Sequence, residues 1–351
     1  MAYPTVVMES AVKRKVRTID ASWSTPQLLE AMLHALKGDG PALSTTDLGI
    51  EEITSQCALV VTTSGSTGDP KSVLLSAHSL LSNARATHKF LNATSGERWS
   101  LLLPTTHIAG LNILIRSIEL GTEPVSLSSK ADYTAIVPTQ LFRALNGDDH
   151  LLKHLQGAKS VLVGGAALSA GVRNQAIAAG IKVVTTYGMS ETSGGCVYNG
   201  EILDGVELEV RGGAIFIRGK VLALNLNLSD GWFETNDLGE IIDGKLVVIG
   251  RSDDVIISGG ENLSLNTIES ILTDLFPAIQ CAAFSVEDPQ WGQSLHIAVV
   301  GDVDPESIAA ALENRIGSFA KPKGVHFVES LPLLGIGKVD RKRLAQGITH
   351  E

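Results

Sequence analysis

The sequence predicts an α/β protein with a large amino-terminal domain of mainly parallel sheets, which also contains a small antiparallel β subdomain. A small, mobile α+β carboxy-terminal domain is expected to follow. Strands and helices alternate from residue 57 to about residue 188, and short strands around glycine turns replace this pattern afterwards. A second series of strands and helices begins after residue 251. A chain of 351 residues is also too long for one core of ordinary size.

The large domain opens with an amphipathic helix over residues 25–37, in which Thr25 can cap the helix, Pro26 suits its first turn and Gly38 can end it. Apolar segments typical of buried strands follow, separated by helical segments, and this alternation predicts a largely parallel sheet. The predicted strands cover residues 57–64, 72–76, 99–104, 123–128, 133–138, 160–165 and 182–188, and the predicted helices cover 77–92, 139–146 and 169–179.

Beyond residue 188, apolar residues alternate at period two in the segments 196–203, 206–219 and 240–250, and Asp243-Gly244 is a strong hairpin signal. These strands are expected to form the small antiparallel unit. We place the large domain at 1–250, a hinge at 251–254 and the small domain at 255–351. The small domain is expected to hold helices at 266–275 and after Asp304-Pro305, and strands at 280–286, 295–300 and 325–329.

Composition excludes several functional classes. The net charge of −10 argues against a surface for nucleic acid or anionic membrane, since both need a basic field. No run approaches the ~20 apolar residues of a membrane span. The amino terminus lacks the order of a secretory signal, and three distant cysteines do not form a disulfide or zinc framework. These features favour a cytoplasmic protein, and a homodimer is compatible with them.

The segment 62–71, TTSGSTGDPK, combines hydroxyl side chains, two glycines and a lysine after a buried strand. Such a segment can bind phosphate through backbone N–H groups, hydroxyls and an ammonium group. A Walker-type P-loop is excluded because Asp69-Pro70 separates Gly68 from Lys71. A solvated Ser/Gly linker would hardly lie between two buried strands, so a phosphate-binding loop is the favoured interpretation.

This loop resembles the phosphate loop of the adenylate-forming superfamily, which includes acyl-CoA synthetases, peptide-synthetase adenylation domains and luciferases. Further segments between residues 57 and 345 resemble the superfamily's motifs in its order. They are the glycine turn beside the adenine at 163–168, the adenine-stacking and magnesium motif at 186–192, the ribose motif at 232–239, the interdomain segment at 250–262, and the lysine strand at 331–338.

The resemblance implies ATP as cosubstrate and Mg²⁺ as cofactor, with Glu191 as the metal ligand. The implied catalytic residues are Lys338, Glu191, Ser190 and His107. The implied nucleotide-binding residues are Thr63, Ser64, Gly65, Ser66, Thr67, Gly68, Lys71, Gly164, Gly165, Ala166, Tyr187, Gly188, Met189, Ser190, Asp237 and Arg251.

The resemblance also implies a second half-reaction with coenzyme A. In this superfamily the small domain turns about a hinge residue, here Asp253, between the two half-reactions. Lys338 then leaves the site, and the segment Ser258, Gly259 and Gly260 approaches the adenylate to frame the coenzyme A channel. An aspartate among polar and small residues suits a position whose φ and ψ must change.

The segments 40–43, 103–111 and 136–141, together with Arg116, resemble the branch of the superfamily that serves menaquinone biosynthesis. The resemblance implies that the acid is an aromatic dicarboxylate. His107, Arg116, Thr139 and Gly188 are the implied acyl-substrate residues. A charge brought into an apolar pocket needs a cation or hydrogen-bond donors. Two alternatives stay open at this point: His107 only gates the pocket, or Arg116 lies on a solvated helix face. Other aryl or short-chain acyl-CoA synthetases, and a non-catalytic nucleotide-binding relative, also remain as alternatives.

Overall fold

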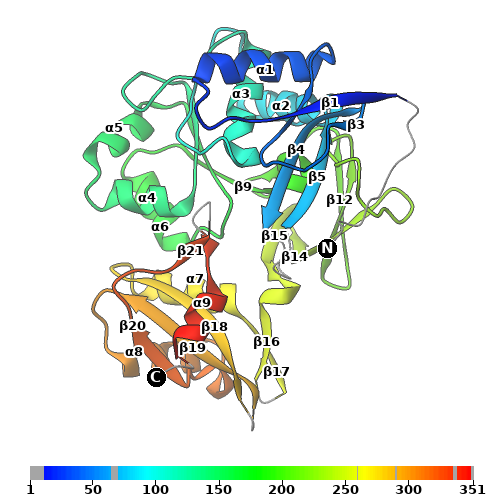
Figure 1. Ribbon diagram of the computed structural model, residues 1–351. Helices are drawn as coiled ribbons and strands as arrows, with labels where there is room; N and C mark the ends of the chain where they lie inside the picture. The colour runs from blue at the N-terminus through cyan, green and yellow to red at the C-terminus, as the bar shows by residue number, and fades with distance from the viewer. Residues whose placement is uncertain (1–11, 65–69, 259, 289–290, 335–337, 349–351) are drawn as a thin grey trace.

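The computed structural model describes residues 12–64, 70–258, 260–288, 291–334 and 338–348 (Figure 1). The first sheet has the strand order β3-β1-β2-β4-β5, and helix α1 (Thr25–Lys37) packs on it. Its strands are β1 (Lys13–Thr18), β2 (Ala42–Ser44), β3 (Glu52–Thr54), β4 (Cys57–Ser64) and β5 (Pro70–Ser76). Strands β4 and β5 are antiparallel, which differs from the parallel arrangement expected of this region. The N-cap of α1 is Ser24 rather than Thr25, and Gly38 ends the helix with φ +82°.

The second sheet has six strands in the order β11-β10-β9-β8-β7-β6. Strands β6 to β9 are parallel, as predicted, whereas β10 and β11 are antiparallel to their neighbours. The strands are β6 (Trp99–Ser100), β7 (Tyr133–Ile136), β8 (Ser160–Val163), β9 (Val183–Met189), β10 (Gly194–Tyr198) and β11 (Glu201–Ile202). The segment 123–128, expected as a strand, contributes one isolated bridge between Val125 and Ser100.

Five helices of the large domain pack around the two sheets and bury most of the apolar side chains in continuous cores. They are α2 (Ala77–Leu91), α3 (Ile108–Leu120), α4 (Pro138–Leu145), α5 (Asp149–Gly157) and α6 (Ala170–Ala178). None of the described helices combines the length and the apolar character that crossing a bilayer requires.

The third sheet is the small antiparallel unit, with the order β12-β13-β14-β15. Its strands are β12 (Val206–Arg211), β13 (Ala214–Gly219), β14 (Phe233–Ile242) and β15 (Lys245–Arg251). The segment 196–203 was expected here, but it supplies β10 and β11 to the six-stranded sheet because β10 pairs with β9.

The small domain follows the 3₁₀ turn η2 (Ser252–Asp254) and has its own apolar core. Arg341 joins its parts, because the guanidinium lies 3.3 Å from the Asp254 carboxylate and 3.0 Å from that of Glu269. The elements are β16 (Val255–Ser258), β17 (Glu261–Ser264), α7 (Leu265–Leu275), β18 (Gln280–Asp288), β19 (Gly292–Val300), α8 (Pro305–Arg315), η3 (Ser318–Ala320), β20 (Gly324–Phe327), β21 (Leu333–Leu334), β22 (Lys338–Val339) and α9 (Arg341–Ile348).

A distant segment completes the free edge of the β4–β5 hairpin. The Leu224 N–H donates to the Leu74 carbonyl at 2.8 Å. The Asn225 side chain accepts from the Leu74 N–H at 3.0 Å and donates to the Ser72 carbonyl at 2.8 Å. Residues about 150 positions further along the chain therefore satisfy the backbone groups of β5.

Candidate active site

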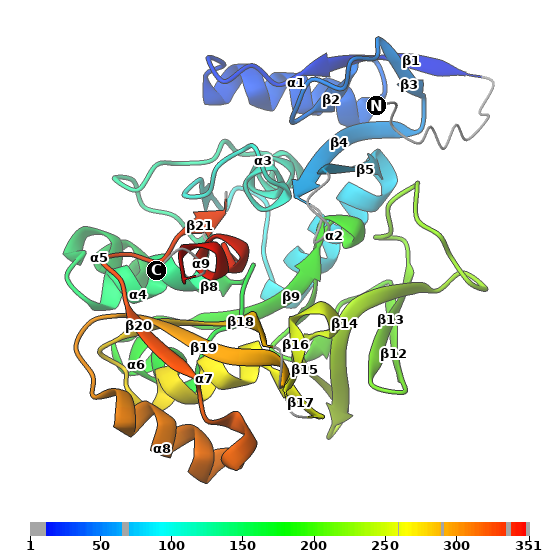
Figure 2. The ribbon, with the colours of Figure 1, turned by 60° about the horizontal axis from the view of Figure 1, so that its bottom comes forward.

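The predicted nucleotide residues gather where parallel strands of the six-stranded sheet end. Gly164, Gly165 and Ala166 follow β8, and Tyr187 to Ser190 follow or close β9. Parallel strands present their carboxyl ends at one edge of a sheet, and ligands of α/β proteins bind at that edge. The antiparallel strands β14 and β15 lie near the end of β9 (Figures 1 and 2).

Three of these residues form one connected group. The Tyr187 hydroxyl donates to Oδ2 of Asp237 at 2.8 Å, and a guanidinium nitrogen of Arg251 lies 3.6 Å from Oδ1 of the same carboxylate. Asp237 and Arg251 face each other because they pair directly in the β14–β15 ladder. Thr235 accepts from the Asp237 N–H at 3.1 Å and helps to orient it. An aromatic ring, a carboxylate and a guanidinium thus lie together at the carboxyl edge.

The pKa of Tyr187 is raised, mainly by burial and further by the neighbouring Asp237 carboxylate. The hydroxyl therefore stays protonated and remains a donor to Asp237 at physiological pH. Asp237 is only 8% exposed, and its carboxylate contacts this donor and Arg251.

Two glycines at this edge are required by close backbone approach. A Cβ atom at Gly188 would lie 2.1 Å from the Gly194 carbonyl oxygen, since β10 runs directly against it. A Cβ atom at Gly164 would lie 2.1 Å from Oγ1 of Thr186. Neither position has room for a side chain, so glycine lets β10 and Thr186 pack directly against the backbone beside Tyr187.

The phosphate-binding segment forms the two arms of the β4–β5 hairpin. Thr63 pairs with Lys71 and Ser64 pairs with Pro70 in the ladder. The predicted ligands at the tip, Gly65, Ser66, Thr67 and Gly68, lie outside the described residues.

Glu191 follows β9 in the 3₁₀ turn η1 (Ser190–Thr192), and it is half-buried. No described residue forms a hydrogen bond or ion pair with its carboxylate, and no cluster of three or more His, Cys, Asp or Glu side chains occurs in the described residues. Mg²⁺ often takes one or two carboxylates together with phosphate oxygens and water. The free carboxylate of Glu191 fits such a site, in which bound ATP would supply the remaining ligands.

Two buried asparagines that the sequence analysis did not identify hold the turn after Glu191. Asn83 of α2 donates to the Gly195 carbonyl at 2.8 Å, and Asn112 of α3 donates to the Ser193 carbonyl at 2.9 Å. Both asparagines are at most 2% exposed. Ser79 and Thr87 are buried on the same side of α2 as Asn83, and Arg116 is buried one turn after Asn112 in α3, so no sequence pattern distinguishes the two asparagines.

On the acyl-substrate side, the structure distributes the predicted residues over three places. His107 is the N-cap residue of α3 and is half-buried, and burial lowers its pKa. Thr139 is exposed at the start of α4. Gly188 lies near the end of β9.

Arg116 lies neither in an open cavity nor on a solvated helix face. It is 4% exposed, and its guanidinium donates to the hydroxyls of Tyr198 at 3.1 Å and Thr87 at 3.4 Å. It also lies 5.0 Å from the Trp99 ring. Its Nε has no hydrogen-bond partner among the described residues. The side chain is therefore a buried cation with neutral partners.

The strand that begins at Lys338 lies beside the large domain. Leu333 of β21, which pairs with β22, shares a groove of about 460 Å³ with Thr139 and Phe142 of α4. The predicted hinge residue Asp253 is in η2, between β15 and β16. Hairpin β16–β17, which carries Ser258 and Gly260, extends away from the large domain (Figure 1). Gly259 lies outside the described residues.

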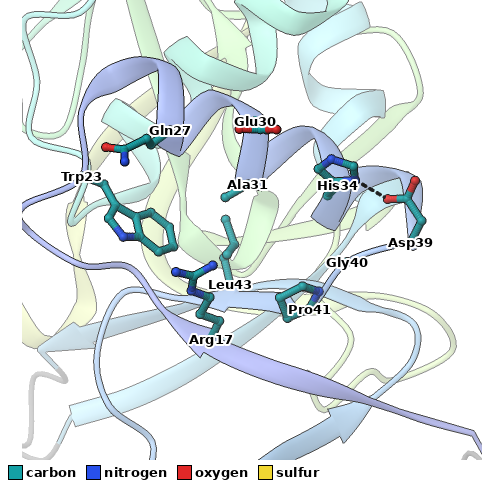
Figure 3. Close-up of a pocket in the computed structure, with 10 residues that line it drawn as sticks. All are labelled: Arg17, Trp23, Gln27, Glu30, Ala31, His34, Asp39, Gly40, Pro41 and Leu43. Carbon is teal, nitrogen blue, oxygen red and sulfur yellow. Dashed lines mark hydrogen bonds and ion pairs between the residues drawn. The ribbon is translucent and has the colours of Figure 1, made fainter.

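A second cavity, of about 300 Å³, lies between α1 and the first sheet, and none of the predicted site residues lines it (Figure 3). Three of its ionisable side chains contact other residues of the lining. The Arg17 guanidinium lies 4.4 Å from the Trp23 ring, and His34 lies 2.8 Å from Asp39. The carboxyl edge of the six-stranded sheet is therefore the candidate active site.

The chain belongs to the AMP-binding enzyme family. The model of that family matches residues 9–219, and the model of the AMP-binding enzyme C-terminal domain matches residues 267–338. A family of AMP-binding enzymes agrees with the aromatic, carboxylate and guanidinium side chains that meet at the carboxyl edge.

Among curated proteins, a probable 2-succinylbenzoate–CoA ligase of Mycobacterium tuberculosis is 38% identical over 95% of this chain and 98% of its own length. The 2-succinylbenzoate–CoA ligase of Lactococcus lactis is 28% identical over 82% of this chain and 70% of its own.

Among solved structures, o-succinylbenzoate CoA synthetase from Bacillus subtilis, in complex with the acyl-adenylate intermediate, has a TM-score of 0.74 at 23% identity over 94% of this chain and 82% of that chain. ATP-bound MatB from Rhodopseudomonas palustris has a TM-score of 0.75 at 22% identity, with the same coverages. These structures confirm the predicted fold of a large α/β domain and a small α+β domain.

Proposed function

We propose that this chain is a 2-succinylbenzoate–CoA ligase, an AMP-forming acid–thiol ligase of menaquinone biosynthesis. The reaction converts o-succinylbenzoate, ATP and coenzyme A to o-succinylbenzoyl-CoA, AMP and pyrophosphate through an acyl-adenylate. The observation that carries the proposal is the Tyr187–Asp237–Arg251 group at the carboxyl edge of the sheet. The names of the relatives at 38% and 28% identity support the choice of acid.

The nucleotide half of the site follows from this group. Tyr187 offers a ring face to the adenine, and Gly164 and Gly188 allow the close packing that holds this part of the edge in place. Asp237 can accept from the ribose hydroxyls through the lone pairs that Tyr187 does not use. Arg251 lies within reach of the same sugar. ATP is thereby oriented with its phosphates towards the β4–β5 hairpin.

The first half-reaction brings two anions together, so its barrier is lowered mainly by positioning and by neutralising charge. Glu191 is the proposed Mg²⁺ ligand, and the bound metal would screen the phosphates. Lys338, at the start of β22, is proposed to supply the cation at the reacting carboxylate and phosphate. Thr63 and Lys71, which pair in the β4–β5 ladder, and Ser190, which follows β9, are proposed to contact the phosphates.

The second half-reaction needs a different domain orientation. Hairpin β16–β17 is proposed to bind coenzyme A, and in the present orientation it extends away from Tyr187 and Asp237 (Figure 1). A rotation of the small domain about Asp253 would move the Lys338 strand out of the active site and bring this hairpin into it. A cytoplasmic location and a homodimer, both compatible with the sequence, stay part of this proposal.

The second carboxylate of the acid needs a partner inside the protein. Arg116 is the proposed partner, since it is a buried cation with only neutral hydrogen-bond partners and an unused Nε among the described residues. At 4% exposure it can be reached only if neighbouring side chains move. His107 and Thr139 are proposed to line the route from the surface.

A thioesterification assay over a panel of acids tests the proposal. The panel should contain o-succinylbenzoate, benzoate, short alkyl acids and a fatty acid, with AMP and thioester measured together. The highest kcat/KM is expected for o-succinylbenzoate. Preference for another acid would contradict the assignment of o-succinylbenzoate as substrate but not the assignment of the reaction class. AMP formation with none of the acids would contradict the assignment as an enzyme.

A further inference from the structure

Helices α6 and α7 belong to different domains and lie side by side (Figures 1 and 2). The backbone N–H of Gly171, in the first turn of α6, donates to Oδ1 of Asp274 in α7 at 2.7 Å. This hydrogen bond joins the large domain to the small domain at a place distant in sequence from the hinge.

The position of Asp274 is unfavourable for its own helix. It lies in the last turn of α7 (Leu265–Leu275), where the helix dipole already places partial negative charge. The same carboxylate is favourable at the amino terminus of α6, where unpaired N–H groups carry partial positive charge. Ser169 accepts from the Val172 N–H at 3.2 Å, so Ser169 and Asp274 serve different donors of α6.

Gly171 allows this approach. A Cβ atom at position 171 would lie 3.2 Å from Oδ1 of Asp274 and 3.6 Å from its Cα. The lack of a side chain lets the end of α7 close on α6 without displacement.

The contact accompanies one particular domain orientation. Leu333, whose strand pairs with the Lys338 strand, shares a groove with Thr139 of α4. In the same orientation, hairpin β16–β17 extends away from the large domain (Figure 1). The bond between Asp274 and Gly171 is therefore present when the Lys338 strand faces the large domain.

We propose that Asp274 is a positioning residue, whose hydrogen bond to the α6 amino terminus holds the small domain in the orientation for acyl-adenylate formation and must break before thioester formation. This inference rests on the proposed ligase function. It adds a second contact point to the hinge, because orientation then depends on the α6–α7 contact as well as on residues 252–254.

A reversible covalent lock tests the inference. In the double variant Gly171→Cys/Asp274→Cys, the close approach of the two positions lets a disulfide form under mild oxidation. Cys57 and Cys196 are buried and should not compete. Cys281 is half-buried beside Thr273, so it is replaced by Ser in every variant, and the single variant Gly171→Cys is the control. The oxidised enzyme should release pyrophosphate in a single turnover but lose at least ~10-fold in thioester formation, and dithiothreitol should restore it.

Failure of the disulfide to form, or undiminished thioester synthesis by the oxidised enzyme, would overturn the inference. Disulfide formation is scored by mass spectrometry, independently of the substrate. If the lock forms but o-succinylbenzoate is not adenylated even by wild type, the substrate proposal fails, while the observed lock supports the α6–α7 contact.

The single charge is tested by Asp274→Asn, with Glu313→Gln on the exposed surface of α8 as matched control. Asp274→Asn should slow adenylate formation about threefold to tenfold, the range of a charge at a helix terminus. Thioester formation from supplied acyl-adenylate should be unchanged or faster, and Tm should not fall. Equal effects on both half-reactions, or on both variants, would contradict a positioning role.

Discussion

The Tyr187 hydroxyl and the Asp237 carboxylate are 2.8 Å apart, and their hydrogen bond joins β9 of the six-stranded sheet to β14 of the antiparallel sheet. The bond fixes the plane of the ring and uses one carboxylate oxygen, while Arg251 lies near the other. Two segments separated by 50 positions therefore define one nucleotide platform.

Removing the charge of Asp237 should weaken nucleotide binding. Asp237→Asn is expected to raise the KM for ATP by roughly tenfold or more, because hydrogen bonds to a charged group contribute about 1.5–3 kcal/mol. Tyr187→Phe keeps the ring and should cost only a few-fold. Glu240→Gln, on the exposed side of the same strand, is the control. Equal KM values for ATP in Asp237→Asn and Glu240→Gln would show that Asp237 does not bind the nucleotide.

Lys338 should serve the first half-reaction only. Lys338→Ala is expected to reduce pyrophosphate release by ~10²-fold or more, the scale of losing one transition-state electrostatic contact. Thioester formation from supplied acyl-adenylate should change much less. Lys342→Ala, on the exposed face of α9, is the matched control. Equal losses in both half-reactions would show that Lys338 does not act in the first step alone.

A proline at the proposed pivot should separate the two steps. Asp253→Pro fixes φ within η2 and should trap one domain orientation, so adenylate formation survives while thioester synthesis falls steeply. Asp253→Ala, which keeps the rotational freedom, should retain both steps. If the proline variant performs both steps normally, the pivot lies at another residue of η2.

Arg116 gives the sharpest test of the acid. Arg116→Met replaces the buried cation with an apolar side chain of similar length. The ratio of kcat/KM for o-succinylbenzoate to kcat/KM for benzoate should fall by an amount equivalent to roughly 2–5 kcal/mol, the usual loss when a buried charge pair is broken. Binding of ATP should barely change. If the ratio stays constant while the free energy of unfolding falls, Arg116 only supports the core around Trp99 and Tyr198.

Acid should destabilise the core around His88. Burial, and then the Arg116 charge, lower the pKa of His88 to about 4 from its ordinary value of 6.5. Between these values the unfolded chain binds a proton that the folded chain does not, so the free energy of unfolding decreases as pH falls from 6.5 towards 4. The neutral ring accepts from Trp99 Nε1 at 3.3 Å, and protonation removes this bond.

The share of His88 in this loss is at most about 3 kcal/mol, since each pKa unit corresponds to about 1.4 kcal/mol. Urea unfolding at pH 7 and pH 4.5 measures it, and His88→Gln should lose less stability over the interval than wild type. An identical pH dependence for the two proteins would show that other groups cause the acid sensitivity.

The sequence predicted those helices and strands that have a strong hydrophobic periodicity. It predicted less well which strands pair with each other and in which direction. The bounds of α1 agree with the predicted 25–37, and the helix after Asp304 begins where its cap and Pro305 place it. The antiparallel β4–β5 pairing was not predicted, because apolar strands look alike whichever direction their neighbours run. Helix α5 was not predicted, although Asp148 caps it and the buried Leu151 and Leu155 lie one turn apart.

The site was predictable where a motif lies in one short segment. Tyr187, Asp237 and Arg251 were each identified in this way, and their direct contact could be seen only once β9, β14 and β15 had been placed. The enclosure of Arg116 was not predictable, because helical periodicity does not distinguish a side chain that faces a cavity from one that faces Tyr198. Asn83 and Asn112 carry no motif, and their role follows from tertiary contacts alone.

The pairing of Asn225 with β5 has a consequence for the order of folding. During synthesis the β4–β5 hairpin is complete at residue 76, yet its outer edge has no partner until residue 225 has left the ribosome. An open apolar strand edge invites intermolecular association during that interval. Asn225→Leu should therefore lower the soluble yield and the refolding rate more than it lowers the activity of the molecules that fold. The reason is that leucine cannot form the two hydrogen bonds of Asn225 to β5, so the strand edge stays unpaired for longer.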